Sequence, residues 1–335
     1  MNEPTASDFP GAYSSTQTLM GVDLGGTKLE VVLLEVPSGA GVYVPAGAPP
    51  LDPATLVTAR KRVPTDASRG YAHIVKLLKD TIESMLAPLP EAQRRTTRIG
   101  VGLPGHISRR TGKVKNSNTV CLNGQDLWNE LRRALGRPVG FENDANCLTL
   151  AEATWGAARG ARTVFGVILG TGVGGGIAHE GQVLSGLQGI AGEWGHNVLE
   201  PGRPCYCGKD GCVEKWLSGP GLERSLLEAV GPDGACSAAD FNQRIERGEP
   251  LSAAEIGVLD AYHRLFGKAL SGVINILDPE VVVIGGGLSQ LRSLYSAGRA
   301  QLAAQVFNDE LLTTLVPASL GDAAGVYGAA LIGEA

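Results

Sequence analysis

The sequence predicts an α/β protein that is built from two related halves. An apolar stretch at residues 18–23 runs into a glycine turn, and a second apolar stretch follows at residues 29–36. The same order returns at residues 164–169, with a glycine turn at 170–176 and another apolar stretch at 177–184. Short apolar runs that are bounded by glycine turns are typical of strands. A strand–turn–strand unit that occurs twice indicates a duplicated architecture.

The first half continues with a loop, a helix and a third strand. Residues 37–53 are rich in Gly, Ala and Pro, and we expect them to form a long hairpin loop. Residues 66–87 carry apolar residues at helical spacing, and Asp66 and Ser68 stand at the start of this run as candidate caps. The apolar run at residues 98–102 predicts the third strand.

The remaining elements follow from capping and glycine signals. A strand at residues 138–141 leads into a helix at residues 145–158, which Gly160 ends. A Ser-x-x-Glu capping box opens a long helix at residues 252–277. The last predicted elements are a strand at residues 281–284 and a helix after the glycines at 285–287.

The composition excludes several classes of protein. The chain has 335 residues, with 29 Lys and Arg against 34 Asp and Glu, so its formal net charge is −5. Hydrophobic residues make up 43% and charged residues 19% of the chain, as in an average globular protein. These values exclude a wholly disordered chain, a collagen and a basic nucleic-acid binder. The length predicts two domains, at residues 18–143 and 144–335, with a disordered tail at 1–17 and a last helix that can pack back on the first domain.

We expect a cytoplasmic protein without a membrane partner. The first basic residue is Lys28, so there is no charged n-region, and no apolar h-region precedes it, which argues against a secretory leader. The best candidate for a membrane segment, residues 164–178, holds six glycines and is too short to span a bilayer. The six cysteines are too few for a disulfide scaffold in a chain of this length.

The first glycine turn has the features of a phosphate site. Glycines let the backbone approach a ligand closely, and successive N–H groups form an anion-binding concavity. Mg²⁺ prefers oxygen ligands and usually keeps several waters, so a carboxylate holds it directly or through water. We therefore predict that Asp23 holds Mg²⁺ and that phosphates bind at Gly25, Gly26, Thr27 and Lys28. A plain hairpin tip is the alternative interpretation of this segment.

A second turn of the same kind strengthens the phosphate prediction. It offers phosphate-binding candidates in the equivalent place, namely Gly170, Thr171, Gly172, Gly174 and Gly175. The turn also matches the G-x-G-x-x-G dinucleotide fingerprint, which requires a helix to begin at the glycines. Residues 177–184 show no helical stripe, and no segment matches the P-loop pattern. A nicotinamide-dependent oxidoreductase therefore stays as the rival enzyme class and is disfavoured.

A cluster of one histidine and three cysteines predicts a metal site. His196, Cys205, Cys207 and Cys212 have the spacing H-x8-C-x-C-x4-C. One imidazole and three thiolates complete a tetrahedral set for Zn²⁺ and leave no position open for water. Such a closed site predicts a structural ion that fixes a loop, whereas three ordinary thiols near a turn are the alternative.

Three carboxylates stand next to these motifs. Glu193 and Glu214 flank the predicted zinc ligands, and carboxylates on a fixed loop are suited to accept hydrogen bonds from the hydroxyls of a polyol. Asn143 and Asp144 stand at a strand-to-helix junction, where either residue is also an ordinary helix cap. The positive end of a helix keeps a carboxylate ionised, so Asp144 is suited to accept a hydroxyl proton during phosphoryl transfer.

Together these motifs resemble those of the ROK (repressor–ORF–kinase) family of sugar kinases, within the actin/hexokinase-like superfamily. The likeness runs from about residue 19 to the C-terminus and leaves out the tail and residues 37–53. Five segments carry it: residues 23–28 (DLGGTK), 142–146 (ENDAN), 169–176 (LGTGVGGG), 192–196 (GEWGH) and 205–214 (CYCGKDGCVE).

The resemblance implies two ribonuclease H-like domains with an ATP–Mg²⁺ cleft between them. It implies that Asp144 is the catalytic base and that both glycine turns hold phosphates. It places the adenosine beside Gly285, Gly286 and Gly287. The sugar contacts that it implies are Asn143, Glu193, His196 and Glu214, with Gly105 and Asn118 in the same pocket.

Three further segments, residues 115–118 (KNSN), 122–124 (LNG) and 191–197 (AGEWGHN), are most similar to bacterial fructokinases. The resemblance therefore implies transfer of the γ-phosphoryl group of ATP to the 6-hydroxyl of a hexose, with D-fructose as the expected substrate and mannose as a second one. The glucokinase and N-acetylglucosamine kinase branches share most of these motifs and stay as alternatives. The sequence leaves the nucleotide preference and the oligomeric state open, although related kinases are commonly dimers.

A sugar-responsive repressor of the same family is the binding-protein alternative. Such a protein needs a helix-turn-helix ahead of the sugar domain. About 20 polar residues precede the first glycine turn, and the net charge is negative. We therefore expect a hexose and ATP as partners, structural Zn²⁺ and Mg²⁺ as cofactors, and no nucleic acid.

Overall fold

The computed structural model describes residues 16–37 and 51–334, and these separate into two compact units. Unit 1 comprises the described residues up to Arg162 together with Ile177–Ala191 and residues 320–334, and unit 2 comprises Thr163–Gly176 and Gly192–Ser319. The boundary that we placed between residues 143 and 144 falls inside unit 1. The predicted tail lies outside the described residues except for residues 16 and 17, and the predicted loop at 37–53 does so except for its ends.

Unit 1 is organised around a mixed five-stranded sheet of order β3-β2-β1-β4-β7. β1 pairs antiparallel with β2 and parallel with β4, so that Asp23 lies opposite both Glu30 and Gly102. The strands are β1 (Thr16–Leu24), β2 (Lys28–Pro37), β3 (Val57–Pro64), β4 (Arg98–Leu103) and β7 (Gly140–Asn143), with a small separate hairpin of β5 (His106–Ile107) and β6 (Val114–Lys115).

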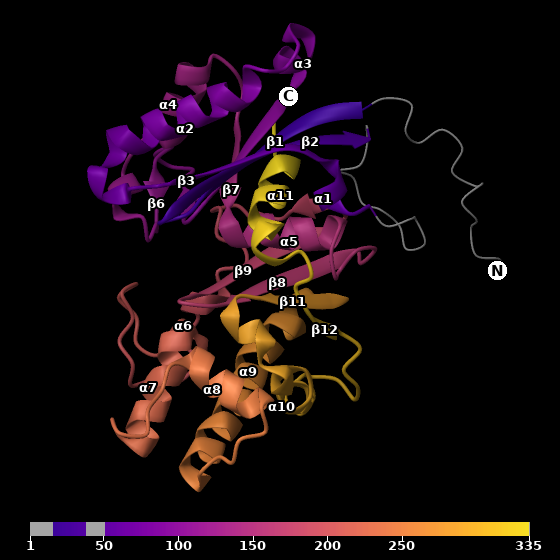
Figure 1. The fold of residues 1–335 in the computed structure, drawn as a ribbon. Helices are drawn as coiled ribbons and strands as arrows, with labels where there is room; N and C mark the ends of the chain where they lie inside the picture. Colours follow the sequence, from indigo (N-terminus) through magenta and orange to yellow (C-terminus); the bar gives the residue numbers. More distant parts are fainter. Residues whose placement is uncertain (1–15, 38–50, 335) are drawn as a thin grey trace, which may run out of the picture. The chain divides into compact units, whose positions relative to one another are not determined.

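Helices cover both faces of this sheet (Figure 1). Successive β2 side chains alternate between the faces, as a strand requires, so Val31 and Leu33 join one apolar cluster while Val32 and Leu34 join another. The first cluster includes residues of α2 (Tyr71–Leu86) and α4 (Leu127–Leu135), and the second includes residues of α5 (Asp144–Thr154) and α11 (Ala324–Leu331). Two short helices, α1 (Pro53–Leu56) and α3 (Glu91–Thr96), complete the unit.

Glycines bring α11 unusually close to the sheet. A Cβ atom on Gly21 of β1 would lie 2.0 Å from the carbonyl oxygen of Val326, and one on Gly100 of β4 would lie 2.0 Å from that of Ala329. Only residues without a side chain allow this approach, because interiors are already packed to near-crystalline density. The segment after residue 320 is therefore an integral part of unit 1.

Unit 2 is organised around the second sheet, whose order is β10-β9-β8-β11-β12. Its strands are β8 (Thr163–Leu169), β9 (Val173–His179), β10 (Gln182–Val183), β11 (Val281–Gly285) and β12 (Thr314–Pro317). The end of β9 and all of β10 are grouped with unit 1. In each sheet the order is third, second, first, fourth and fifth strand along the chain, and the fourth strand runs parallel to the first. The predicted duplicated α/β architecture is confirmed.

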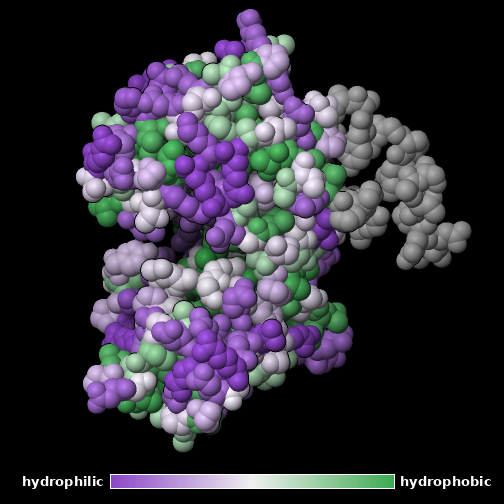
Figure 2. Space-filling model, viewed as in Figure 1, coloured by the Kyte–Doolittle hydropathy of each residue, from purple (hydrophilic) through white to green (hydrophobic). Residues whose placement is uncertain are grey.

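The helices of unit 2 are α6 (Glu214–Leu217), α7 (Gly219–Val230), α8 (Ala238–Glu246), α9 (Ala253–Leu277) and α10 (Ala297–Ala303). The predicted capping box is present, because the side chains of Ser252 and Glu255 bond each other's backbone N–H groups at the start of α9. Hydrophilic residues gather over α8 and α9 on the face shown in Figure 2. No helix among the described residues has the length and apolarity that crossing a membrane requires.

Three local predictions differ from the structure. α2 begins at Tyr71 after Gly70 and has no side-chain cap, because Asp66 belongs to a preceding short 3-10 turn. α5 ends at Thr154 rather than at residue 158. Beyond this end, the Glu152 carbonyl oxygen accepts the N–H groups of Gly156 and Ala158, and its carboxylate accepts that of Ala157. The helix expected after residues 285–287 is the 3-10 turn Gly287–Gln290.

Candidate functional site

The first glycine turn joins β1 to β2 in unit 1. The Gly25 N–H donates to the Lys28 carbonyl oxygen over 2.9 Å, which closes the turn. Thr65, which follows β3, fixes it from the side: its hydroxyl donates to the Gly25 carbonyl oxygen (2.8 Å) and its N–H to that of Thr27 (3.0 Å). The Lys28 ammonium lies 3.6 Å from the carboxylate of Glu30, a buried residue of β2. The turn is thus held by residues around it and keeps its tip exposed.

Two carboxylates meet at the carboxyl ends of β1 and β7. Asp23 stands near the end of β1, and Asp144 is the first residue of α5, directly after β7. Burial raises the pKa of Asp23 from 3.8 to about 6, and the charge of Asp144 adds to this shift. The two acids therefore interact electrostatically.

Asn143, not Asp144, caps α5. Its side-chain oxygen accepts N–H groups of Ala145 (2.8 Å) and Asn146 (3.4 Å), while its amide nitrogen donates to the Gly105 carbonyl oxygen over 3.4 Å. Gly105 has a φ of +99°, and a Cβ there would lie 2.7 Å from a backbone oxygen of Lys115, so the position requires glycine. The Asp144 carboxylate also accepts the Ala145 N–H, over 2.9 Å, so both side chains bond the first turn of α5.

Two cavities of unit 1 contain the predicted ligand residues. Gly105 and Asn143 line one of about 540 Å³, together with aromatic and polar neighbours that include Trp128 and Glu142. Asn118 lines a second one of about 740 Å³, and Gly26 and Thr27 of the glycine turn line the same cavity. Gly105 and Asn118, which we expected in one pocket, therefore line two different cavities. In unit 1, predicted sugar-binding and phosphate-binding residues therefore line cavities.

The second glycine turn joins β8 to β9 in unit 2. The Gly170 N–H donates to the Gly172 carbonyl oxygen over 3.0 Å, and β9 begins at Val173, so the last glycines of the motif already belong to a strand. A strand at this place contradicts the helix that a dinucleotide fingerprint needs. Gly286 packs on the end of β8, since a Cβ there would lie 2.4 Å from the Leu169 carbonyl oxygen. The predicted adenosine-side glycines thus adjoin this phosphate turn.

The four predicted zinc ligands come together in unit 2. One ligand atom from each of His196, Cys205, Cys207 and Cys212 lies within 4.8 Å of all the others. The His196 Nδ1 atom is 3.7 Å from the Cys205 sulfur, and the Cys207 and Cys212 sulfurs are 3.5 Å apart. One nitrogen and three sulfurs are the donor set of a closed tetrahedral zinc site. The residues therefore fit the ion.

The surroundings of this cluster also suit a metal. The Nε2 atom of His196 lies 3.1 Å from the Tyr206 hydroxyl, a partner that orients the ring so that Nδ1 faces the sulfurs. Burial raises the pKa of Cys212 to about 12, and the thiols of Cys207 and Cys205 add to the shift. A thiol loses its proton when it binds Zn²⁺, so binding here releases protons and weakens in acid.

The two glutamates beside the zinc ligands lie next to the second glycine turn. The Glu214 carboxylate accepts the N–H of Val173 over 3.2 Å, and a Cβ on Gly172 would lie 2.8 Å from it. Glu193 precedes the 3-10 turn Trp194–His196, whose Trp194 ring donates to the Gly174 carbonyl oxygen over 2.9 Å. Unit 2 therefore contains the second glycine turn, the four predicted metal ligands and both carboxylates.

Sequence reasoning missed several residues that hold these sites. The Glu142 carboxylate accepts the Asn143 N–H, the Asn146 amide and the Ser185 hydroxyl, at 2.6–2.9 Å. Thr65 fixes the first turn, and Arg203, between the predicted metal ligands His196 and Cys205, has a buried side chain. Thr65, Arg203 and the Glu142–Ser185 pair act across 12 to 43 residues of chain, so no local motif marks these contacts.

The family of the chain follows from a comparison with known proteins. The model of the ROK family matches residues 52–335. The chain belongs to the ROK family.

Relatives of this ROK protein align over nearly their whole length. It is 32% identical over 323 residues to the N-acetylgalactosamine kinase AgaK of Shewanella sp. (strain ANA-3), covering 94% of this chain and 96% of the relative. It is also 32% identical to an N-acetyl-D-glucosamine kinase of Yersinia pseudotuberculosis, covering 93% and 97%. The crystal structure of a ROK hexokinase from Thermus thermophilus is similar with a TM-score of 0.73 at 30% identity, covering 95% of this chain and 98% of that one. The predicted family and the hexokinase-like fold are therefore confirmed.

The raised pKa of Asp23 in this ROK protein yields a stability prediction. Asp23 has a pKa of about 6 when folded and 3.8 as the ordinary value, so its charge costs stability above pH 6 and costs none below about pH 4. We expect Asp23→Asn to stabilise the protein, without nucleotide and Mg²⁺, by up to about 3 kcal/mol at neutral pH. Thermal unfolding should give a higher midpoint than wild type at pH 7.5 and a smaller difference at pH 4.5.

The control for this prediction is Asp80→Asn, which removes an exposed carboxylate that pairs with Lys76 on α2. We expect this variant to lose a few tenths of a kcal/mol at most. An Asp23→Asn protein that is no more stable than wild type at pH 7.5 would show that Asp23 is ionised at no cost.

Proposed function

We propose that this ROK protein transfers the γ-phosphoryl group of ATP to the 6-hydroxyl of a hexose. One observation carries the proposal: each unit has a fixed glycine turn after its first strand, and the unit 1 turn has a pair of carboxylates beside it. Phosphoryl transfer needs positioning and charge stabilisation of the phosphates, together with one group that accepts the hydroxyl proton. The two units supply these parts separately.

Asp144 is the proposed general base. It is the first residue of α5, where the helix dipole favours its charged form, and Asn143 already provides the cap. An ionised carboxylate within hydrogen-bond reach of the 6-hydroxyl accepts its proton as the phosphoryl group arrives. The reaction then passes through no covalent enzyme intermediate.

Backbone N–H groups of both glycine turns and the side chains of Thr27 and Lys28 are the proposed phosphate ligands. Asp23 is the proposed Mg²⁺ ligand, directly or through water. The negative charge of Asp144 makes ionisation of Asp23 less favourable, and a bound divalent cation would offset this repulsion. Bound Mg²⁺ supplies charge neutralisation at the phosphate oxygens. The adenosine is assigned to the surface around Gly286, which packs on the end of β8.

The proposed sugar ligands are Gly105, Asn118, Asn143, Glu193, His196 and Glu214. Carboxylates accept hydrogen bonds from hydroxyl groups, and amides both accept and donate them. A site of this kind discriminates strongly against an analogue that lacks one hydroxyl. Zn²⁺ is assigned a structural role, since its four protein ligands leave no open position. It would fix the segment that carries His196 and ends beside Glu214.

We propose an N-acetylhexosamine as the substrate. Both curated relatives named above are N-acetylhexosamine kinases and align over more than nine-tenths of this chain, and they give no support to our expectation of D-fructose. D-Fructose stays as a second candidate because residues 115–118 and 122–124 are similar to bacterial fructokinases. Asn123 holds this region together by accepting the Ser117 N–H and donating to the Ser117 carbonyl oxygen.

A substrate panel tests the proposal. We expect ATP-dependent ADP release with N-acetylglucosamine or N-acetylgalactosamine at a kcat/KM at least tenfold above that with fructose, mannose or glucose. A preference for fructose would replace the first candidate by the second. An enzyme that binds ATP but phosphorylates none of the five sugars would overturn the proposed function.

A further inference from the structure

Arg203 is a charged residue with almost no exposed surface. It stands in the metal loop, defined here as residues 196–212, two residues before the cysteine at 205. Its backbone oxygen accepts the Gly211 N–H over 2.9 Å, which closes the loop. Its side chain leaves the loop and is 2% exposed. A buried guanidinium needs several acceptors, so its contacts indicate which parts of the unit it holds together.

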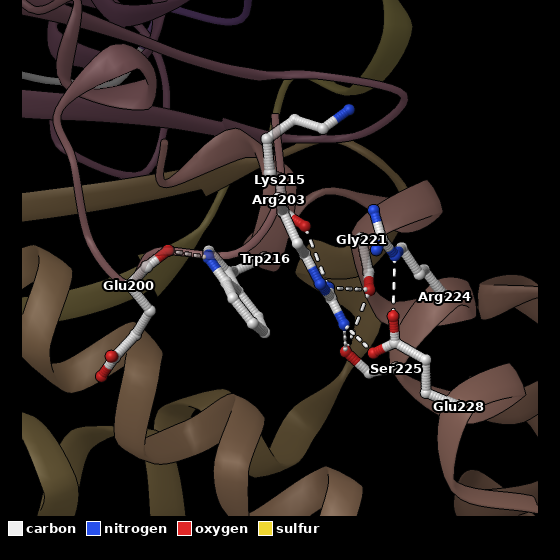
Figure 3. A network of polar contacts seen from close by, with 8 residues as sticks. All are labelled: Glu200, Arg203, Lys215, Trp216, Gly221, Arg224, Ser225 and Glu228. Atoms are coloured by element: carbon white, nitrogen blue, oxygen red, sulfur yellow. Dashed lines mark hydrogen bonds and ion pairs between the residues drawn. The ribbon is translucent and has the colours of Figure 1, made fainter. Parts of the chain in front are cut away.

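The guanidinium joins α6 to α7 (Figure 3). One terminal nitrogen donates to the carbonyl oxygens of Lys215 (3.0 Å) and Gly221 (2.9 Å). The other donates to the Ser225 hydroxyl (3.0 Å) and to the Glu228 carboxylate (2.6 Å). Four acceptors on two helices therefore converge on one planar group.

An aromatic contact adds to this anchor. The guanidinium carbon lies 3.8 Å from the centre of the Trp216 ring, within the range of a cation–π interaction. The Trp216 ring nitrogen donates to the Glu200 carbonyl oxygen over 2.8 Å. The metal loop thus contacts α6 at Lys215 and at Trp216. These contacts come from Arg203 and Glu200, which are not among the predicted zinc ligands.

The anchored helix begins with Glu214. The carboxylate of this residue has one hydrogen bond to the glycine turn, from the Val173 N–H. A second contact with the same turn comes from the start of α7, where the Gly219 N–H donates to the Gly170 carbonyl oxygen over 2.8 Å. The direction in which Glu214 points therefore depends on how the backbone of α6 is held.

We propose that Arg203 is a positioning residue that orients Glu214 toward the sugar, independently of the metal ion. The inference rests on the proposed function, since it assigns a task to a residue behind one proposed sugar ligand. An arginine suits this task because its planar fork serves several acceptors at once, whereas a lysine offers a single compact charge.

The test compares three variants of the full-length enzyme. Arg203→Met removes all four donors and keeps the aliphatic part, and Arg203→Lys keeps the buried charge. The matched control is Arg224→Met, because Arg224 is an exposed cation that pairs with the same Glu228 carboxylate from α7. Each variant is measured for KM of the hexose, KM of ATP, kcat, zinc content and unfolding midpoint.

We expect both Arg203 variants to raise the KM for the hexose by about tenfold, equivalent to about 1.4 kcal/mol. The KM for ATP, kcat and the zinc content should stay within twofold of wild type, as should every parameter of Arg224→Met. An unchanged hexose KM in Arg203→Lys, whatever its unfolding midpoint, would overturn the proposal. The hexose is the one that wild type phosphorylates fastest, so failure of the proposed function appears in wild type before any variant is compared.

Discussion

Asp144→Asn should lower kcat by about 10²- to 10⁴-fold, the range that a general base contributes. Asparagine has the shape of aspartate but accepts no proton at neutral pH. The α5 cap is provided by Asn143, so the helix and the fold should be unaffected. Calorimetric titration should show that ATP and the hexose still bind.

Asp126→Asn is the matched control for this variant. Asp126 also stands at the start of a helix in unit 1, where it pairs with Arg133, and no role in the reaction is assigned to it. We expect near wild-type kcat from this control. Near-normal turnover in Asp144→Asn would remove Asp144 as the base, and loss of ATP binding would indicate a role in the phosphate site instead.

The Asp144→Asn variant should also change the titration of Asp23. The charge of Asp144 contributes to the raised pKa of Asp23, so its removal should lower that pKa from about 6. Mg²⁺ binding by wild type should weaken as the pH falls through 6, and this loss should move to lower pH in the variant. The same titration thus measures the coupling between the two carboxylates.

Cys207→Ser should lose most of the bound zinc and raise the KM for the hexose at least tenfold. Wild type should carry about one Zn²⁺ per chain in elemental analysis. Cys207 is the exposed member of the cluster, so the substitution leaves the core intact while it removes one of four ligands. A three-ligand site is open and binds the metal less tightly.

Cys236→Ser is the control for the metal prediction, because Cys236 is a partly exposed free thiol outside the cluster. It should keep both the zinc and the hexose KM of wild type. A wild-type enzyme that is fully active with Mg²⁺ but carries no zinc would contradict the structural role. Zinc loss should also follow acidification, since each thiol must be deprotonated to bind the metal.

The sequence predicted what local patterns encode. Three features lie within short segments and can be recognised from the order of residues alone. They are the strand–glycine-turn–strand units, the helix that begins with Ser252 and Glu255, and the four predicted metal ligands. The helix ends were less predictable: Gly70 rather than Asp66 precedes α2, because Asp66 opens a separate 3-10 turn that ends before α2.

Contacts between distant segments were not predictable from a single sequence. Thr65 bonds the turn at Gly25 across 40 residues, and Arg203 reaches Glu228 across 25. Such partners are specified by the folded sheet and helices, not by spacing along the chain. The supporting residues of the candidate site therefore emerged only from the structure.

The return of α11 to unit 1 has a consequence for biosynthesis. Every residue of unit 2 precedes α11 in the chain, so the glycines of β1 and β4 stay uncovered until the whole of unit 2 has been made. Domains generally fold as units during synthesis. Here the N-terminal unit is the one that closes last, and a nascent chain arrested before residue 320 should expose the apolar face of its sheet to chaperones.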